Sequence, residues 1–196
     1  MTAVHPIEAE SYRILAERAD LSHLAPLSRA VVARVIHASA DLDFATSMVV
    51  EEAALAHALE ALCNGAPIIT DVEMVRSGIA DPSVECYLAE ASATASRTRS
   101  AAGIRIAARH HPQGAIFVVG CAPTALIELI ELAAADEIEP KLVIGMPVGF
   151  VGAAESKAAL RASRLPSVSN VGEKGGSAVA AAAANALIHA KGDPHA

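Results

Sequence analysis

Hydrophobic positions along the chain alternate between short apolar runs and longer amphipathic stretches. The run Ala115–Val119 is apolar throughout and ends at Gly120, as in a strand covered on both faces. Pro123 fits the first turn of a helix, and apolar side chains then follow at helical spacing to Glu131. Lys141–Leu160 repeats the order of apolar strand, Gly/Pro-rich turn and helix. Two such units predict a parallel sheet, in which ligands bind beyond the carboxyl ends of the strands.

The same criteria predict the other elements. Further strands are expected at Ala66–Thr70, Val84–Leu88 and, more weakly, Ser167–Asn170, which gives a mainly parallel five-stranded sheet. Helices are expected at Ile7–Arg18, after Pro26, and at Glu51–Asn64, Val72–Ile79, Ala91–His110 and an Ala-rich stretch ending near His189. The strand ends would then share one rim of the sheet. Helix N-termini at that rim present unpaired N–H groups, which favour anions.

The length, composition and charge of the chain exclude several classes of protein. A length of 196 residues fits a single domain over residues 1–196 with a sizeable core. Hydrophobic residues make up 53% and charged residues 19%, which excludes a disordered chain. Aromatic residues make up only 3%, and the net charge is −7 with scattered Lys and Arg, so no nucleic-acid partner is expected. Neither a signal peptide nor a membrane-spanning stretch is found, so we expect a cytoplasmic protein without a membrane partner.

The usual sequence signatures of metal and nucleotide sites are missing. Cys63, Cys86 and Cys121 lie far apart and form no CxxC pair, so we expect neither disulfides nor a metal site. Gly172–Ser177 is rich in glycine, but Lys174 precedes the glycine pair, whereas a Walker A loop needs GxxxxGK[ST]. A GxGxxG fingerprint is also absent from the strand–turn–helix junctions. A Gly-rich turn before a helix is therefore the better interpretation of this segment.

His37 is the residue whose position suggests chemistry. At about 100° per residue, it lies about 200° from Val35, which belongs to the apolar stripe of its helix. His37 shares a face with Ala30, Ala33 and Arg34. Two small residues and one cation leave room for a large ligand to approach. A lone histidine on a helix is also a common structural residue, so this pattern leaves a structural and a catalytic role open.

Short motifs occur in a fixed order along nearly the whole chain. They are Ser11-Tyr12, Val35–Ala38, Gly65–Ile69 with Asp71 and Glu73-Met74, Thr98–Ser100, Ala122–Leu126, Gly145–Val151 with Ala154–Lys157, Gly175–Ser177 and Asn185–Leu187. In this order they resemble the precorrin-8X methylmutase family of corrin biosynthesis, also called cobalt-precorrin-8 methylmutase. One motif alone is weak evidence, whereas the full ordered set is specific.

The resemblance implies a fold and a reaction. The implied fold is a flavodoxin-like three-layer α/β fold, in a homodimer whose active sites lie near the interface. The implied enzyme is an isomerase that needs no dissociable cofactor and moves a ring methyl group from C-11 to C-12 of precorrin-8X, giving hydrogenobyrinate. His37 matches the family's catalytic histidine, the proton donor and acceptor. Imidazole suits both steps, because it donates and accepts protons near neutral pH.

The resemblance also implies residues that contact the substrate. Ser11 and Arg99 match family positions associated with substrate contact. The acetate and propionate groups of a corrinoid need cations and hydrogen-bond donors around them. The complete expected set of substrate-binding residues is Ser11, Arg34, Thr98, Arg99, Ser100 and Lys157.

Two positions differ from the family pattern. Cys121 stands where the family usually has asparagine, and Glu173 stands where the family tends to be basic. Two other functions therefore stay open. One is a non-catalytic tetrapyrrole-binding or carrier protein of the same fold, and the other is a phosphate-ligand binding module of flavodoxin-like type.

Overall fold

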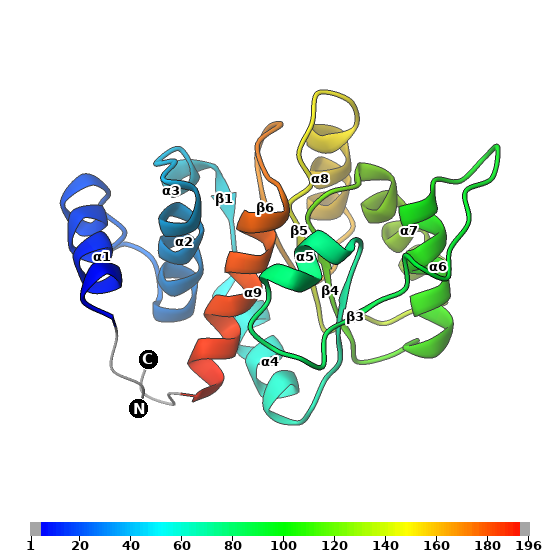
Figure 1. The fold of residues 1–196 in the computed structure, drawn as a ribbon, viewed down its shortest axis with the longest axis horizontal. Coiled ribbons are helices and arrows are strands. Elements are labelled where there is room, and N and C mark those ends of the chain that lie inside the picture. Colours follow the sequence, from blue (N-terminus) through cyan, green and yellow to red (C-terminus); the bar gives the residue numbers. More distant parts are fainter. Residues whose placement is uncertain (1–4, 193–196) are drawn as a thin grey trace.

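A computed structural model describes residues 5–192 as a sheet with helices on both faces (Figure 1). The helices are α1 (Pro6–Arg18), α2 (Pro26–Ser39), α3 (Phe44–Ser47), α4 (Glu52–Cys63), α5 (Glu73–Gly78), α6 (Arg99–His110), α7 (Pro123–Ala134), α8 (Ala153–Ala162) and α9 (Ser177–Gly192). The strands are β1 (Met48–Val49), β2 (Ile68–Thr70), β3 (Glu85–Cys86), β4 (Ile116–Val119), β5 (Leu142–Gly145) and β6 (Ser167–Asn170). No helix in the described range is long and apolar enough to cross a membrane.

The sheet has the order β1-β6-β5-β4-β2-β3. All neighbours are parallel except β1, which pairs antiparallel with β6. The five parallel strands alone follow the order 2-1-3-4-5 of flavodoxin-like folds, so the expected three-layer α/β class is confirmed. The expected count of five strands is wrong by one, because β1 spans only two residues and is too short to produce a period-two pattern.

The helix expected at Ala91–His110 begins only at Arg99. Thr98 caps it, with its hydroxyl oxygen accepting a hydrogen bond from the Ala101 N–H at 3.3 Å. In the preceding segment Ala alternates with Ser and Thr, whose hydroxyls compete for backbone groups. The Thr94 hydroxyl, for example, accepts from the Arg97 N–H at 3.1 Å. Residues 91–98 therefore form a loop.

Alternate residues of the strands feed two separate cores. Ile116 and Val118 of β4 belong to the core shared with α2, α4 and α9, whereas Phe117 and Val119 belong to the core shared with α6, α7 and α8. All four side chains are buried, which explains why this run lacks polar positions. Burying a side chain such as Phe117 contributes about 1.5–3 kcal/mol. The two cores fix the sheet and, with it, the rim at the carboxyl ends of the parallel strands.

Candidate active site

His37 lies in the last turn of α2 and is held by α1. Its Nδ1 atom lies 2.8 Å from the Ser11 hydroxyl oxygen. The Tyr12 ring stacks on the imidazole, with centroids 4.8 Å apart and planes 11° apart. Tyr12 has no predicted role in the sequence beyond the Ser11-Tyr12 motif, because its contact with His37 depends on how the two helices pack. Together these contacts fix the orientation of the imidazole ring.

The second nitrogen of His37 is available for proton transfer. Among the residues that the structure describes, none forms a hydrogen bond with Nε2, and the side chain is half-buried. When the Ser11 hydroxyl donates to Nδ1, the proton of the neutral ring resides on Nε2. This geometry allows His37 to donate and accept a proton at Nε2.

Arg34 lies beside this histidine, on the same side of α2. Its guanidinium lies 3.3 Å from the Glu8 carboxylate and 3.3 Å from the Tyr12 hydroxyl. It borders a hollow of about 330 Å³, lined in part by the small residues Ala30 and Ala33 and by His189 of α9. The small residues that the helical pattern placed beside His37 do line an open space.

Thr98, Arg99 and Ser100 lie together at the start of α6. The Thr98 hydroxyl lies 2.7 Å from that of Thr124, and Arg99 Nε donates to the Leu88 carbonyl at 3.0 Å. Arg99 is exposed at an open cavity of about 780 Å³, which the N-terminal parts of α7 and α8 also line. This group can therefore offer a cation and hydroxyls to a large anion.

The structure separates these two groups within one chain. The first, Ser11, Arg34 and His37, lies on α1 and α2, which precede the edge strand β1, and α2 packs on α9 at one face of the sheet. The second, Thr98–Ser100, follows β3 at the opposite edge, and α6 packs at the other face. Figure 1 shows α1 and α2 at one end of the molecule and α6 at the other. The expected site residues thus form two groups instead of one.

The structure does not place Lys157 with either group. Its side chain is fully buried, and Nζ donates to the Asn170 side-chain oxygen at 3.2 Å and to the Lys174 carbonyl at 2.5 Å. Burial, reinforced by the charge of Arg161, lowers the pKa of Lys157 to about 8. In this arrangement Lys157 supports the loop between β6 and α9, and it presents no cation to a ligand.

The lowered pKa of Lys157 predicts a change of stability with pH. An unfolded lysine binds its proton up to about pH 10.4, whereas the folded one releases it near pH 8. Between these values the unfolded state binds more protons, so this group makes the free energy of unfolding rise with pH. We expect urea unfolding at pH 8.0 and 9.5 to show this gain for the wild type relative to Lys157→Met. The comparison cancels the titration of other groups, and an equal pH dependence in both proteins would contradict the assignment.

Asp71 closes the rim at the topological switch point between β2 and β4. Its side chain is only 2% exposed and accepts hydrogen bonds from the N–H groups of Gly120, Cys121 and Ala122 at 3.1, 2.9 and 2.8 Å. Burial raises the pKa of Asp71, and these three bonds oppose that effect. These three N–H groups belong to the turn between β4 and α7, which ends at Ala122, the N-cap residue of α7. The carboxylate of Asp71 therefore holds this turn in place at the rim.

Fold and site together define the class of protein. A flavodoxin-like domain with an oriented histidine and separate arginine-bearing surfaces is suited to acid–base chemistry on an anionic small molecule. The family model described as precorrin-8X methylmutase matches residues 6–190, and the chain belongs to this family. The resemblance of the ordered motifs is thereby confirmed.

Named relatives agree with this assignment. The cobalt-precorrin-8 methylmutase of Methanothermobacter thermautotrophicus is 44% identical over 174 residues, which cover 86% of this chain and 84% of the relative. The precorrin-8X methylmutase of Pseudomonas aeruginosa is 39% identical, covering 92% of this chain and 93% of the relative. A crystal structure of a precorrin-8X methylmutase from Thermus thermophilus superimposes with a TM-score of 0.85 at 36% identity, covering 98% of this chain and all of the other.

Proposed function

We propose that this protein is an isomerase that moves a ring methyl group from C-11 to C-12 of precorrin-8X, or of its cobalt-containing equivalent, in cobalamin biosynthesis. One observation carries the proposal: His37 Nδ1 lies 2.8 Å from the Ser11 hydroxyl, which orients the ring for transfer at Nε2. Family membership and the names of the relatives support the same reaction.

The proposed mechanism needs a proton and no nucleophile. In its imidazolium form, with Nδ1–H hydrogen-bonded to the Ser11 hydroxyl, His37 donates the Nε2 proton to the conjugated macrocycle, which becomes more electron-poor. The methyl group then migrates between adjacent ring carbons. The same nitrogen takes a proton back, so atoms and charge balance over the cycle. Ser11 keeps Nδ1 hydrogen-bonded throughout, and Tyr12 keeps the ring in plane for both transfers.

The substrate is a large polycarboxylate, and a homodimer can supply the cations that it needs. In the proposed dimer each site takes His37, Ser11 and Arg34 from one subunit and Thr98–Ser100 from the other. The separation of these groups within one chain supports this arrangement. Phe150 and Val151, each 89% exposed, lie in the loop between β5 and α8. Neighbouring apolar side chains this exposed are typical of surfaces that a partner or ligand covers.

The direct test of the proposed function is whether the protein converts its substrate. The purified protein is incubated with precorrin-8X, and separately with cobalt-precorrin-8, while the absorption spectrum is recorded. We expect the spectrum of hydrogenobyrinate, or of its cobalt form, to replace that of the substrate. A carrier protein would bind the substrate and leave it chemically unchanged. A phosphate-binding module would bind neither corrinoid.

Arg99 provides a test of substrate contact. Because its guanidinium is exposed at the larger cavity, Arg99→Ala is expected to weaken hydrogenobyrinate binding by about 1.5–3 kcal/mol, the value of a charge-assisted hydrogen bond. Calorimetric titration measures the change. Arg109→Ala, at the exposed other end of α6, is the matched control and should bind like the wild type. Unchanged affinity in Arg99→Ala would remove this residue from the site.

If each site is shared between two subunits, the activity of mixed dimers provides a second test. His37→Ala and Arg99→Ala subunits should each be impaired as homodimers. When the two variants are co-expressed, half of the sites in each mixed dimer combine an intact His37 with the partner's intact Arg99, so activity should reappear. Mixed dimers that form but stay inactive would show that each site is built from one chain.

A further inference from the structure

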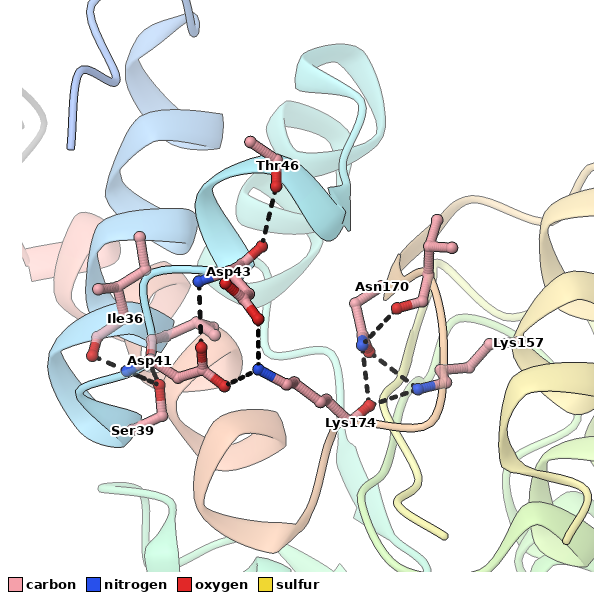
Figure 2. Close-up of polar contacts among 10 residues, drawn as sticks. Ile36, Ser39, Asp41, Asp43, Thr46, Lys157, Asn170 and Lys174 are labelled. Atoms are coloured by element: carbon pink, nitrogen blue, oxygen red, sulfur yellow. Dashed lines mark hydrogen bonds and ion pairs between the residues drawn. The ribbon is translucent and has the colours of Figure 1, made fainter. Parts of the chain in front are cut away.

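Lys174 joins two parts of the molecule that are far apart in sequence. Its Nζ lies 2.6 Å from an oxygen of Asp41 and 2.6 Å from an oxygen of Asp43, which are 133 and 131 residues away (Figure 2). Both aspartates lie between α2 and α3, directly after the helix that carries His37. Lys174 itself lies in the loop between β6 and α9. The contact therefore links this loop to the end of α2.

The loop side of this contact is rigidly supported. The Lys174 carbonyl accepts hydrogen bonds from buried Lys157 at 2.5 Å and from buried Asn170 at 2.8 Å (Figure 2). Gly175 follows with φ 157°, and a Cβ there would lie 2.3 Å from the Met146 carbonyl oxygen. No side chain fits at that position. A shift of the backbone at Lys174 would therefore break buried hydrogen bonds and disturb the close packing of Gly175 against the backbone that follows β5.

The C-terminal end of α2, on the other side of this contact, depends on contacts from outside the helix. Ala40, the C-cap of α2, has φ 52°, a left-handed conformation that costs a non-glycine residue about 1–2 kcal/mol. The Ser39 hydroxyl donates to the Val35 carbonyl at 2.8 Å and accepts from the Asp41 N–H at 3.2 Å. These bonds tie Asp41 to the last turn of α2, where His37 lies. Any displacement of Asp41 is thereby passed on to this turn.

The two ion pairs add little to the stability of the fold, and their main effect is to hold Lys174 and the two aspartates in position. The side chains of Lys174, Asp41 and Asp43 are 49%, 30% and 73% exposed, and ion pairs at such sites contribute only about 0–1 kcal/mol. The hydrogen bond from Lys174 is the main cause that lowers the pKa of Asp41, and the two aspartates raise the pKa of Lys174. Both shifts favour the charged forms of Asp41 and Lys174, which the ion pair between them needs.

We propose that Lys174, Asp41 and Asp43 form a clamp that positions the last turn of α2, and with it the imidazole of His37, for proton transfer. Lys174 is a positioning residue, and Lys157 and Asn170 are its buried support. The proposal rests on the proposed function. It adds that the geometry of His37 depends on the β6–α9 loop as well as on Ser11 and Tyr12.

Three variants test the clamp by kinetics. Lys174→Met removes both ion pairs and keeps the apolar stem, Lys174→Arg keeps the charge, and Lys141→Met removes an exposed lysine elsewhere. We expect Lys174→Met to lower kcat by about 10–100-fold, as misplaced catalytic groups do, with Kd for hydrogenobyrinate within about twofold of the wild type. Lys174→Arg should restore most of the rate, and Lys141→Met should match the wild type. In an Asp41→Asn/Asp43→Asn background, Lys174→Met should cause no further loss.

A second readout needs no substrate. In the free protein, the imidazole NMR signals of His37 report whether Nδ1 stays hydrogen-bonded to Ser11. We expect these signals to shift or broaden in Lys174→Met and to stay unchanged in Lys141→Met. If the wild type does not convert precorrin-8X, the proposed function fails, while the imidazole signals still decide whether the clamp exists. Unchanged signals, an unchanged kcat, or a joint fall of kcat, product affinity and thermal midpoint in Lys174→Met would each overturn the clamp.

Discussion

Replacing His37 by alanine is expected to abolish methyl migration while the protein still folds and binds product. Loss of a positioned proton donor typically lowers a rate by about 10²–10⁴-fold, which would reduce conversion to a trace. Product binding should persist, since removing a half-buried ring only enlarges the space beside α2. Turnover, hydrogenobyrinate affinity and thermal midpoint are measured on the same preparation.

Two variants of the residues around His37 separate orientation from proton transfer. Ser11→Ala removes the partner of Nδ1 and keeps the imidazole, so it should lower kcat less than His37→Ala does. Tyr12→Phe keeps the stacked ring and should retain most activity. If His37 were structural, its truncation would lower the thermal midpoint while the folded fraction kept its specific activity. A folded, product-binding His37→Ala protein with near wild-type turnover would contradict the catalytic assignment.

The parts of the fold that the sequence predicted are those set by local pattern. Buried parallel strands are apolar at every position, so Ala115–Val119 could be located without neighbours. The edge strand β1 has two residues, and its pairing with β6 is a contact between distant segments. No local pattern records such a contact. The segment 91–98 looked helical because alanine is frequent in it, but its hydroxyls bond to the loop backbone instead.

In the candidate site, too, local pattern predicts some features, whereas contacts between distant segments decide the others. Helical spacing placed His37 off the apolar stripe, and the structure leaves it half-buried while Val35 of the stripe is fully buried. The Ser11–His37 hydrogen bond joins residues 26 apart, and its geometry depends on the packing of α1 against α2. Lys157 is expected among the substrate-binding residues, because the carboxylates of a corrinoid need cations around them. The loop that covers it comes from the segment after β6, which helix periodicity cannot show.

Asp71 has no predicted role in the sequence, although its position after a buried strand carries a structural signal. A carboxylate directly after a buried parallel strand lies at the rim, where helix N-termini gather. Such a side chain either faces a ligand or satisfies the chain's own N–H groups. The structure shows the second case, since all three acceptor contacts of Asp71 go to the turn between β4 and α7.

Replacing Asp71 by alanine is therefore expected to be strongly destabilising. The N–H groups of Gly120, Cys121 and Ala122 would lose their acceptor at a nearly inaccessible site, and each buried unsatisfied donor costs about 1–3 kcal/mol. Allowing for water entry, we expect a total loss of about 3–5 kcal/mol in the free energy of unfolding. For a chain of this size that corresponds to a fall of about 6–20 °C in thermal midpoint.

Two further variants identify the cause of that loss. Asp71→Asn keeps the side-chain volume and one oxygen acceptor. Its free energy of unfolding should therefore lie between that of the wild type and that of Asp71→Ala. Asp20→Ala, which removes an exposed aspartate between α1 and α2, should keep the free energy of unfolding within about 0.5 kcal/mol of the wild type. Urea unfolding monitored by circular dichroism gives all three values. If Asp71→Ala unfolds at the wild-type urea concentration, the turn between β4 and α7 does not depend on this carboxylate.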